Sequence, residues 1–143
     1  MDRLVDQMTT YALDLSYNDL PAEVVARTKH LILDTVGCAL GASPSQPATI
    51  ARAMAGQISS DTPATVMVGG QKTSPDLAAF ANGVMIRYLD YNDMYNNVGG
   101  CHPSDMLAPV LATVDAVHGD GKDVILGMVL GYETYCSVAD GSA

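Results

Sequence analysis

Residues 81–109, ANGVMIRYLDYNDMYNNVGGCHPSDMLAP, gather carboxylates, amides, tyrosines and an imidazole into one short stretch of a 143-residue chain. The apolar spacing in its first half is typical of a helix, which we expect to end close to Asp90. A loop with two glycines then leads to CHPSD at 101–105, where Ser104 or His102 can cap the next helix. The pattern predicts two helix ends that bring reactive side chains together.

Helical periodicity also runs on both sides of this stretch. Residues 2–15 (with Asp2 as a cap), 21–42, 47–58, 107–117 and 124–139 each show it. The only sheet signal is the β-branched run near 63–68, which is followed by Gly69-Gly70. We therefore predict a mainly α, multi-helix fold with one small β-hairpin at about residues 63–73. Gly37 and Gly41 favour a close helix crossing, and the alternative is a helix that stops at Gly41.

Composition excludes several classes of function. The net charge of −9 and seven scattered Lys and Arg residues argue against nucleic acid, which binds clustered cations. No apolar run approaches the roughly 20 residues that span a bilayer, and the acidic start is unlike a signal peptide. Three widely spaced cysteines without a CxxC pair give no zinc or iron–sulfur ligand set. We expect a soluble, cytoplasmic protein with no membrane partner.

Asp90 and His102 form the first candidate pair, because a carboxylate and an imidazole can divide proton abstraction and donation. Free amides at the start of the helix from Pro103 can bind a substrate carboxylate or an enolate. In the structural alternative, His102 caps that helix and Asp105 stabilises its dipole. A magnesium or manganese site formed by Asp90, Asp93, His102 and Asp105 is a weaker alternative, and we expect no metal.

Two neighbouring residues leave further alternatives open. Arg87 lies three residues before Asp90, so on a helix it can form an ion pair with that carboxylate or bind a substrate carboxylate. Cys101 adjoins His102, but residues next to each other in sequence rarely place a thiol and an imidazole for nucleophilic catalysis.

Four segments of the chain resemble the N-terminal helical region of the MmgE/PrpD family, which includes 2-methylcitrate dehydratase, cis-aconitate decarboxylase and iminodisuccinate epimerase. They are LPAEVVARTKHLILDTVGCALGAS (20–43), PATVMVGGQKTSPDLAAFANGVMIRYLDYND (63–93), GGCHPSDMLAPVLA (99–112) and GYETYCSVAD (131–140). The resemblance implies a helical, normally dimeric domain joined to a smaller lid domain. It also implies cofactor-free lyase or isomerase chemistry on a small-molecule polycarboxylate.

The resemblance also implies roles for individual residues. The aspartate of the family's LDxND element falls on Asp90 and the HPSD histidine on His102, which are expected to transfer protons. We expect the surrounding residues Arg87, Tyr91, Asp93 and Ser104 to contact the substrate. The family usually has Thr where this chain has Met94, which lacks a hydroxyl to donate.

Family chains are several times longer and take active-site lysines and much of the lid from later sequence. We therefore expect residues 1–143 to be one truncated helical domain without the lid and C-terminal helices. A second copy (a dimer) or a hetero-partner would then complete a dehydratase-like site. The alternatives are a non-catalytic binding or assembly subunit, and a natural-product isomerase or cyclase on the reduced scaffold.

Overall fold

The computed structural model describes residues 3–96, 100 and 102–141, and it confirms the mainly α fold with one small hairpin. Its α-helices are α1 (Arg3–Asp14), α2 (Ala22–Ala42), α3 (Gln46–Ala55), α4 (Pro75–Arg87), α5 (Leu107–Ala116) and α6 (Gly121–Gly141). The short 3₁₀ helices η1 (Tyr17–Asp19) and η2 (Pro103–Met106) precede α2 and α5. The strands are β1 (Ala64–Thr65) and β2 (Lys72–Thr73).

Local signals explain where these helices begin and end. α4 starts with Pro75 at its first position, where the missing N–H costs no hydrogen bond. α3 is shorter than predicted and ends at Ala55, while the side chain of Ser45 accepts a hydrogen bond from the amide of Ala48 at its start. α5 stops before His118, whose φ of 57° cannot continue a right-handed helix. Asp2, the predicted cap of α1, lies outside the described residues.

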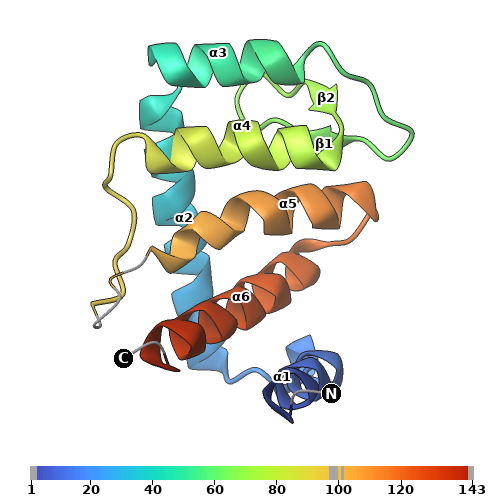
Figure 1. Cartoon of the computed structure of the whole chain (residues 1–143), viewed down its shortest axis with the longest axis vertical. Helices are drawn as coiled ribbons and strands as arrows, with labels where there is room; N and C mark the ends of the chain where they lie inside the picture. The colour runs from blue at the N-terminus through green and yellow to red at the C-terminus, as the bar shows by residue number, and fades with distance from the viewer. Residues whose placement is uncertain (1–2, 97–99, 101, 142–143) are drawn as a thin grey trace.

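Helices α3, α4, α5 and α6 lie side by side in one layer, and α2 crosses them (Figure 1). Small residues make the core thin, so the helix backbones can approach closely. The larger buried side chains between them include Met85, Ile86, Leu107 and Met128. The buried alanines of these helices are Ala39, Ala42, Ala48, Ala51, Ala55, Ala78, Ala81, Ala108 and Ala112.

Glycines of α2 and α6 test the close packing directly. A Cβ at Gly127 would lie 3.0 Å from Val110 of α5, so α5 and α6 touch where that glycine sits. At Gly41 a Cβ would lie 3.1 Å from Leu89, and α2 continues to Ala42. The neighbour of Gly41 is the side chain of Leu89, which follows α4, so a helix crossing at Gly41 stays a prediction. The prediction is wrong for Gly37, where an added Cβ would meet no atom of another element within 4 Å.

The predicted hairpin is present and is joined to α4 by one buried side chain. Ala64 pairs with Thr73 and Thr65 with Lys72 in an antiparallel register. Asn82 of α4 accepts a hydrogen bond from the Met67 amide at 2.9 Å and donates to the Thr65 carbonyl at 3.1 Å. Because a buried amide left without partners is costly, Asn82 fixes the hairpin against the helix.

α1 differs from the other α-helices because none of its residues is buried. Its apolar residues have the predicted helical spacing, yet Leu13 is 80% exposed and Leu4 59%. Among the helices of the described residues, none combines the length and apolar character that crossing a membrane requires.

Candidate functional site

The candidate site lies where α4 ends and η2 begins. Asp90 follows α4 with a φ of 55°, a left-handed conformation that aspartate tolerates better than most residues. Its amide donates to the carbonyl of Arg87 at 3.1 Å, which closes the last turn. The chain then reverses direction, and Asn92 and Asp93 reach the start of η2.

Arg87 lies among the acidic groups of the site. It forms an ion pair with Asp90, and its Nε lies 3.7 Å from Oδ2 of Asp105. Its Nη1 also donates to Oδ1 of Asn92 at 3.2 Å. The hydrogen bond and charge of Arg87 hold the pKa of Asp90 below its ordinary value, so Asp90 stays ionised near neutral pH.

Asn92 is the buried centre of this cluster, with 6% of its surface exposed. Its Nδ2 donates to Oγ of Ser104 at 3.0 Å and to Oδ1 of Asp105 at 2.9 Å. Burial raises the pKa of Asp105 above its ordinary value, against the opposing effects of Arg87 and Asn92. Asn92 therefore ties the loop to η2, a position that the sequence analysis did not assign.

His102 stands at the N-cap position of η2, but its side chain makes no capping hydrogen bond. The positions that the structural alternative gave to His102 and Asp105 are therefore confirmed, because Asp105 lies in the first turn of η2, but the imidazole does not act as a hydrogen-bonding cap. Its Nδ1 instead lies 2.7 Å from the backbone carbonyl of Asp93, and its Nε2 lies 3.9 Å from Oδ1 of Asp90. The imidazole is 21% exposed, so it is partly shielded but open to solvent.

The carboxylate of Asp93 is held from two sides. Oδ1 accepts a hydrogen bond from the amide of Ser104 at 3.0 Å, and Oδ2 accepts one from the hydroxyl of Tyr132 on α6 at 2.7 Å. Burial and the Asp93 carboxylate raise the pKa of Tyr132 well above its ordinary value. Tyr132 belongs to the GYE segment quoted for the family resemblance, but the sequence offered no local signal that it meets Asp93.

Of the residues named from the sequence, Asp90, His102, Arg87, Asp93 and Ser104 converge. Tyr91 is 80% exposed, and no hydrogen bond or ion pair of the described residues joins its side chain to them. Met94 is exposed too. Cys101, named as a possible neighbour of the imidazole, lies outside the described residues.

Two further expectations concerned free backbone amides at the start of the helix from Pro103 and a metal site. The amide of Ser104 binds Asp93 and that of Asp105 binds the His102 carbonyl, so these two amides are not available to a substrate. Within residues 3–96, 100 and 102–141, no group of three or more His, Cys, Asp or Glu side chains is arranged to hold a metal ion.

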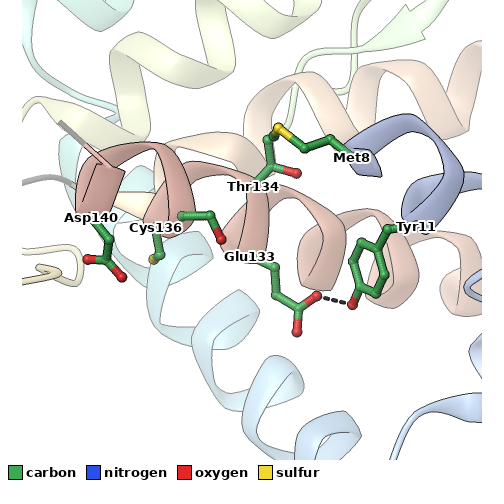
Figure 2. A pocket seen from close by; sticks show the side chains of 7 residues that line it. Met8, Tyr11, Glu133, Thr134, Cys136 and Asp140 are labelled. Carbon is green, nitrogen blue, oxygen red and sulfur yellow. Dashed lines mark hydrogen bonds between the residues drawn. The ribbon is translucent and has the colours of Figure 1, made fainter. Parts of the chain in front are cut away.

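A separate pocket of about 530 Å³ lies between α1 and α6 (Figure 2). Met8 and Tyr11 of α1 face Glu133 and neighbouring residues of α6, and the Tyr11 hydroxyl donates to the Glu133 carboxylate. This hydrogen bond raises the pKa of Tyr11 to about 12. Adjacent residues of α6 thus belong to the two places: Glu133 lines the pocket, and Tyr132 contacts the candidate site.

Comparison with known proteins gives the family. Residues 6–143 match the model of the MmgE/PrpD N-terminal domain. A 2-methylcitrate dehydratase from Salmonella typhimurium is 31% identical over 96% of this chain and 30% of its own length. A cis-aconitate decarboxylase from Aspergillus terreus is 30% identical over 92% of the chain and 28% of its own length. This chain thus spans less than a third of these relatives, and through its match to their N-terminal domain it belongs to the MmgE/PrpD family.

Proposed function

We propose that the chain supplies the proton-transfer groups of a cofactor-free lyase or isomerase, which removes a proton alpha to a carboxylate of a small polycarboxylate. The relatives support the substrate class, because they are named for 2-methylcitrate and cis-aconitate. The observation that carries the proposal is the separation of 3.9 Å between Nε2 of His102 and Oδ1 of Asp90. A substrate C–H bond placed beside these atoms would meet a base and a fixed negative charge together.

The two groups have different roles in this proposal. Asp90 stays ionised because Arg87 lowers its pKa, so it is a poor proton donor near neutral pH. His102 is then the base, and Asp90 stabilises the imidazolium that forms when the proton is taken. Such general base catalysis contributes roughly 10²–10⁴-fold to a rate.

The charges at the site indicate that it needs further cations to bind a polycarboxylate. Arg87 is the cation that the structure places here, and its charge is already shared between Asp90 and Asp105. A polycarboxylate would meet a cluster with more negative than positive groups. We propose that further cations come from outside the described residues, from a second copy of this chain or from a partner chain.

A turnover assay tests the assignment. 2-Methylcitrate and cis-aconitate are each incubated with wild type, His102→Gln and Asp90→Asn, and the products are measured by mass spectrometry. We expect His102→Gln to lower turnover by roughly 10²–10⁴-fold. His30→Gln, at an exposed histidine of α2, is the control and should match wild type. Equal and measurable turnover in all four proteins would show that the proposed roles are wrong.

Exposed apolar side chains favour a second candidate, a non-catalytic binding or assembly subunit. Leu33 and Leu40 of α2 are 71% and 57% exposed, and apolar surface of this kind is commonly covered in an assembly. This candidate predicts no turnover together with self-association in light scattering. A strictly monomeric chain at high concentration would count against it.

A further inference from the structure

We propose that Tyr132 is a positioning residue that acts through Asp93 to hold the imidazole of His102 in the tautomer with its lone pair on Nε2. The inference rests on the proposed function for its consequence, since Nε2 is the atom that faces Asp90. Its geometry stands on three linked contacts, from Tyr132 to Asp93, from Ser104 to Asp93, and from Asp93 to His102.

The contact at Nδ1 defines the tautomer. Nδ1 of His102 lies 2.7 Å from the carbonyl oxygen of Asp93, and a carbonyl oxygen can only accept a hydrogen bond. Nδ1 therefore carries the proton. Because a neutral imidazole has one N–H, Nε2 then presents a lone pair, as a base must.

The position of the Asp93 carbonyl depends on the contacts of the Asp93 side chain. Asp93 is fixed at both carboxylate oxygens, by the Ser104 amide on one side and by the Tyr132 hydroxyl on the other. Ser104 follows His102 by two residues, so the first bond holds the short segment that carries the imidazole. The second bond joins this loop to α6, which packs into the core through Met128 and Gly131.

Close packing places the Tyr132 hydroxyl within reach. A Cβ at Gly131 would lie 3.2 Å from the Cβ of Met106, so α6 passes η2 almost backbone to backbone at this point. The next residue, Tyr132, is half-buried and spans the remaining distance to Asp93. Burial and the neighbouring carboxylate raise its pKa, so the phenol remains a hydrogen-bond donor throughout the neutral range.

Tyr132 is distinct from the groups that would touch substrate. Its hydroxyl is directed to Asp93, and the imidazole nitrogen that faces Asp90 is on the far side of the ring from the Asp93 carbonyl. Loss of this hydroxyl would leave His102 and Asp90 chemically intact. It would change the fraction of molecules in which Nε2 is free to accept a proton.

Nuclear magnetic resonance measures that fraction without a substrate. Long-range ¹H–¹⁵N correlation spectra of the ¹⁵N-labelled chain, recorded at about pH 9 to keep imidazoles neutral, distinguish the two tautomers by their nitrogen shifts. His102→Gln identifies the His102 signals, and His30 and His118 act as internal references. In wild type we expect the Nδ1–H form to predominate at His102.

Tyr132→Phe is the main variant, and Tyr135→Phe on the exposed side of α6 is its matched control. We expect Tyr132→Phe to shift the tautomer ratio toward Nε2–H by about fivefold, the change that loss of one typical hydrogen bond produces. Tyr135→Phe should leave the ratio unchanged. Where the chain turns over substrate, kcat should fall in Tyr132→Phe with little change in KM.

Asp93→Ala breaks the same link from the other end, because it removes both carboxylate oxygens that accept from Tyr132 and from the Ser104 amide. It serves as the test if Tyr132→Phe fails to fold, and it should shift the ratio in the same direction. A predominant Nε2–H form in wild type, or an unchanged ratio in a folded Tyr132→Phe, would overturn the inference. A chain that shows the tautomer shift but turns over substrate equally well as wild type and as His102→Gln would overturn the proposed function and leave the positioning role standing.

Discussion

Adjacent residues of α6, Tyr132 and Glu133, each take part in a tyrosine–carboxylate contact, and these contacts differ in burial. Tyr132 donates to Asp93, whose carboxylate is also held by a backbone amide of η2. Glu133 accepts a hydrogen bond from Tyr11 of α1, a helix without a buried residue (Figure 2). The same chemical pair is thus part of a packed cluster on one side of α6 and an exposed contact on the other.

The difference shows that burial determines how much a polar contact contributes to stability. On the packed side, removing one partner leaves a buried group without a hydrogen bond, which costs about 1–3 kcal/mol. On the exposed side, water replaces the lost partner, and such contacts contribute about 0–1 kcal/mol. The site is therefore determined by the core beneath it, whereas α1 is held by contacts that contribute little.

The largest effect should come from the core itself. Leu107 of α5 is fully buried in the main hydrophobic cluster, so Leu107→Ala should lower the free energy of unfolding by about 2–5 kcal/mol. Leu13→Ala makes the same change on exposed α1 and should alter it by less than about 0.5 kcal/mol. Urea titration followed by circular dichroism measures both. Similar losses in the two variants would remove the distinction between the two regions.

Asn92→Ala should have the next largest effect. The change leaves Ser104 and Asp105 without their donor and should cost about 1–3 kcal/mol. It should also raise the pKa of Asp105 further, because the Asn92 hydrogen bond opposes the effect of burial. Asn18→Ala, at an exposed asparagine of η1, is the control and should be nearly neutral. A neutral Asn92→Ala would mean that the buried cluster contributes nothing to stability.

The two tyrosines can then be compared directly. Tyr132→Phe should lower the free energy of unfolding by about 1–2 kcal/mol, because it leaves a partly buried carboxylate oxygen of Asp93 without its donor. Tyr11→Phe should change it by less than about 0.5 kcal/mol. In addition, Glu133→Gln should return the pKa of Tyr11 from about 12 toward its ordinary value of 10.0, as measured by ultraviolet titration. A larger loss for Tyr11→Phe than for Tyr132→Phe would reverse the comparison.

Local sequence patterns account well for the helices and the hairpin. Apolar periodicity predicted α4, and two glycines after a β-branched run predicted the turn that joins β1 to β2. The same patterns could not show that α1 is uncovered, because an amphipathic helix has the same spacing whether or not another element covers it.

The candidate site was predictable only in part, for a similar reason. The order of the LDYND and HPSD motifs led to the expectation that Asp90 and His102 meet, and their proton-transfer roles stay predictions. Asn92 was passed over because a loop amide between two acids has no distinctive spacing. Tyr132 lies 39 residues from Asp93, and local periodicity carries no information about a pairing at that distance.

The smallest expected effect on stability comes from a change at the exposed edge of the site. Arg87→Gln removes the charge that lowers the pKa of Asp90, so that pKa should rise toward its ordinary value of 3.8. A carboxyl whose pKa is lower in the folded state stabilises the fold above its unfolded pKa, and the contribution disappears as pH falls through the folded value. Wild type should therefore lose more stability than Arg87→Gln as the pH falls below about 4. Arg27→Gln, at an exposed arginine of α2, is the control, and ¹³C carboxyl shifts of Asp90 measure the pKa itself. An unchanged pKa in Arg87→Gln would mean that solvent already screens this ion pair, and the exposed edge would then resemble the α1 side of α6 more than the buried cluster beside it.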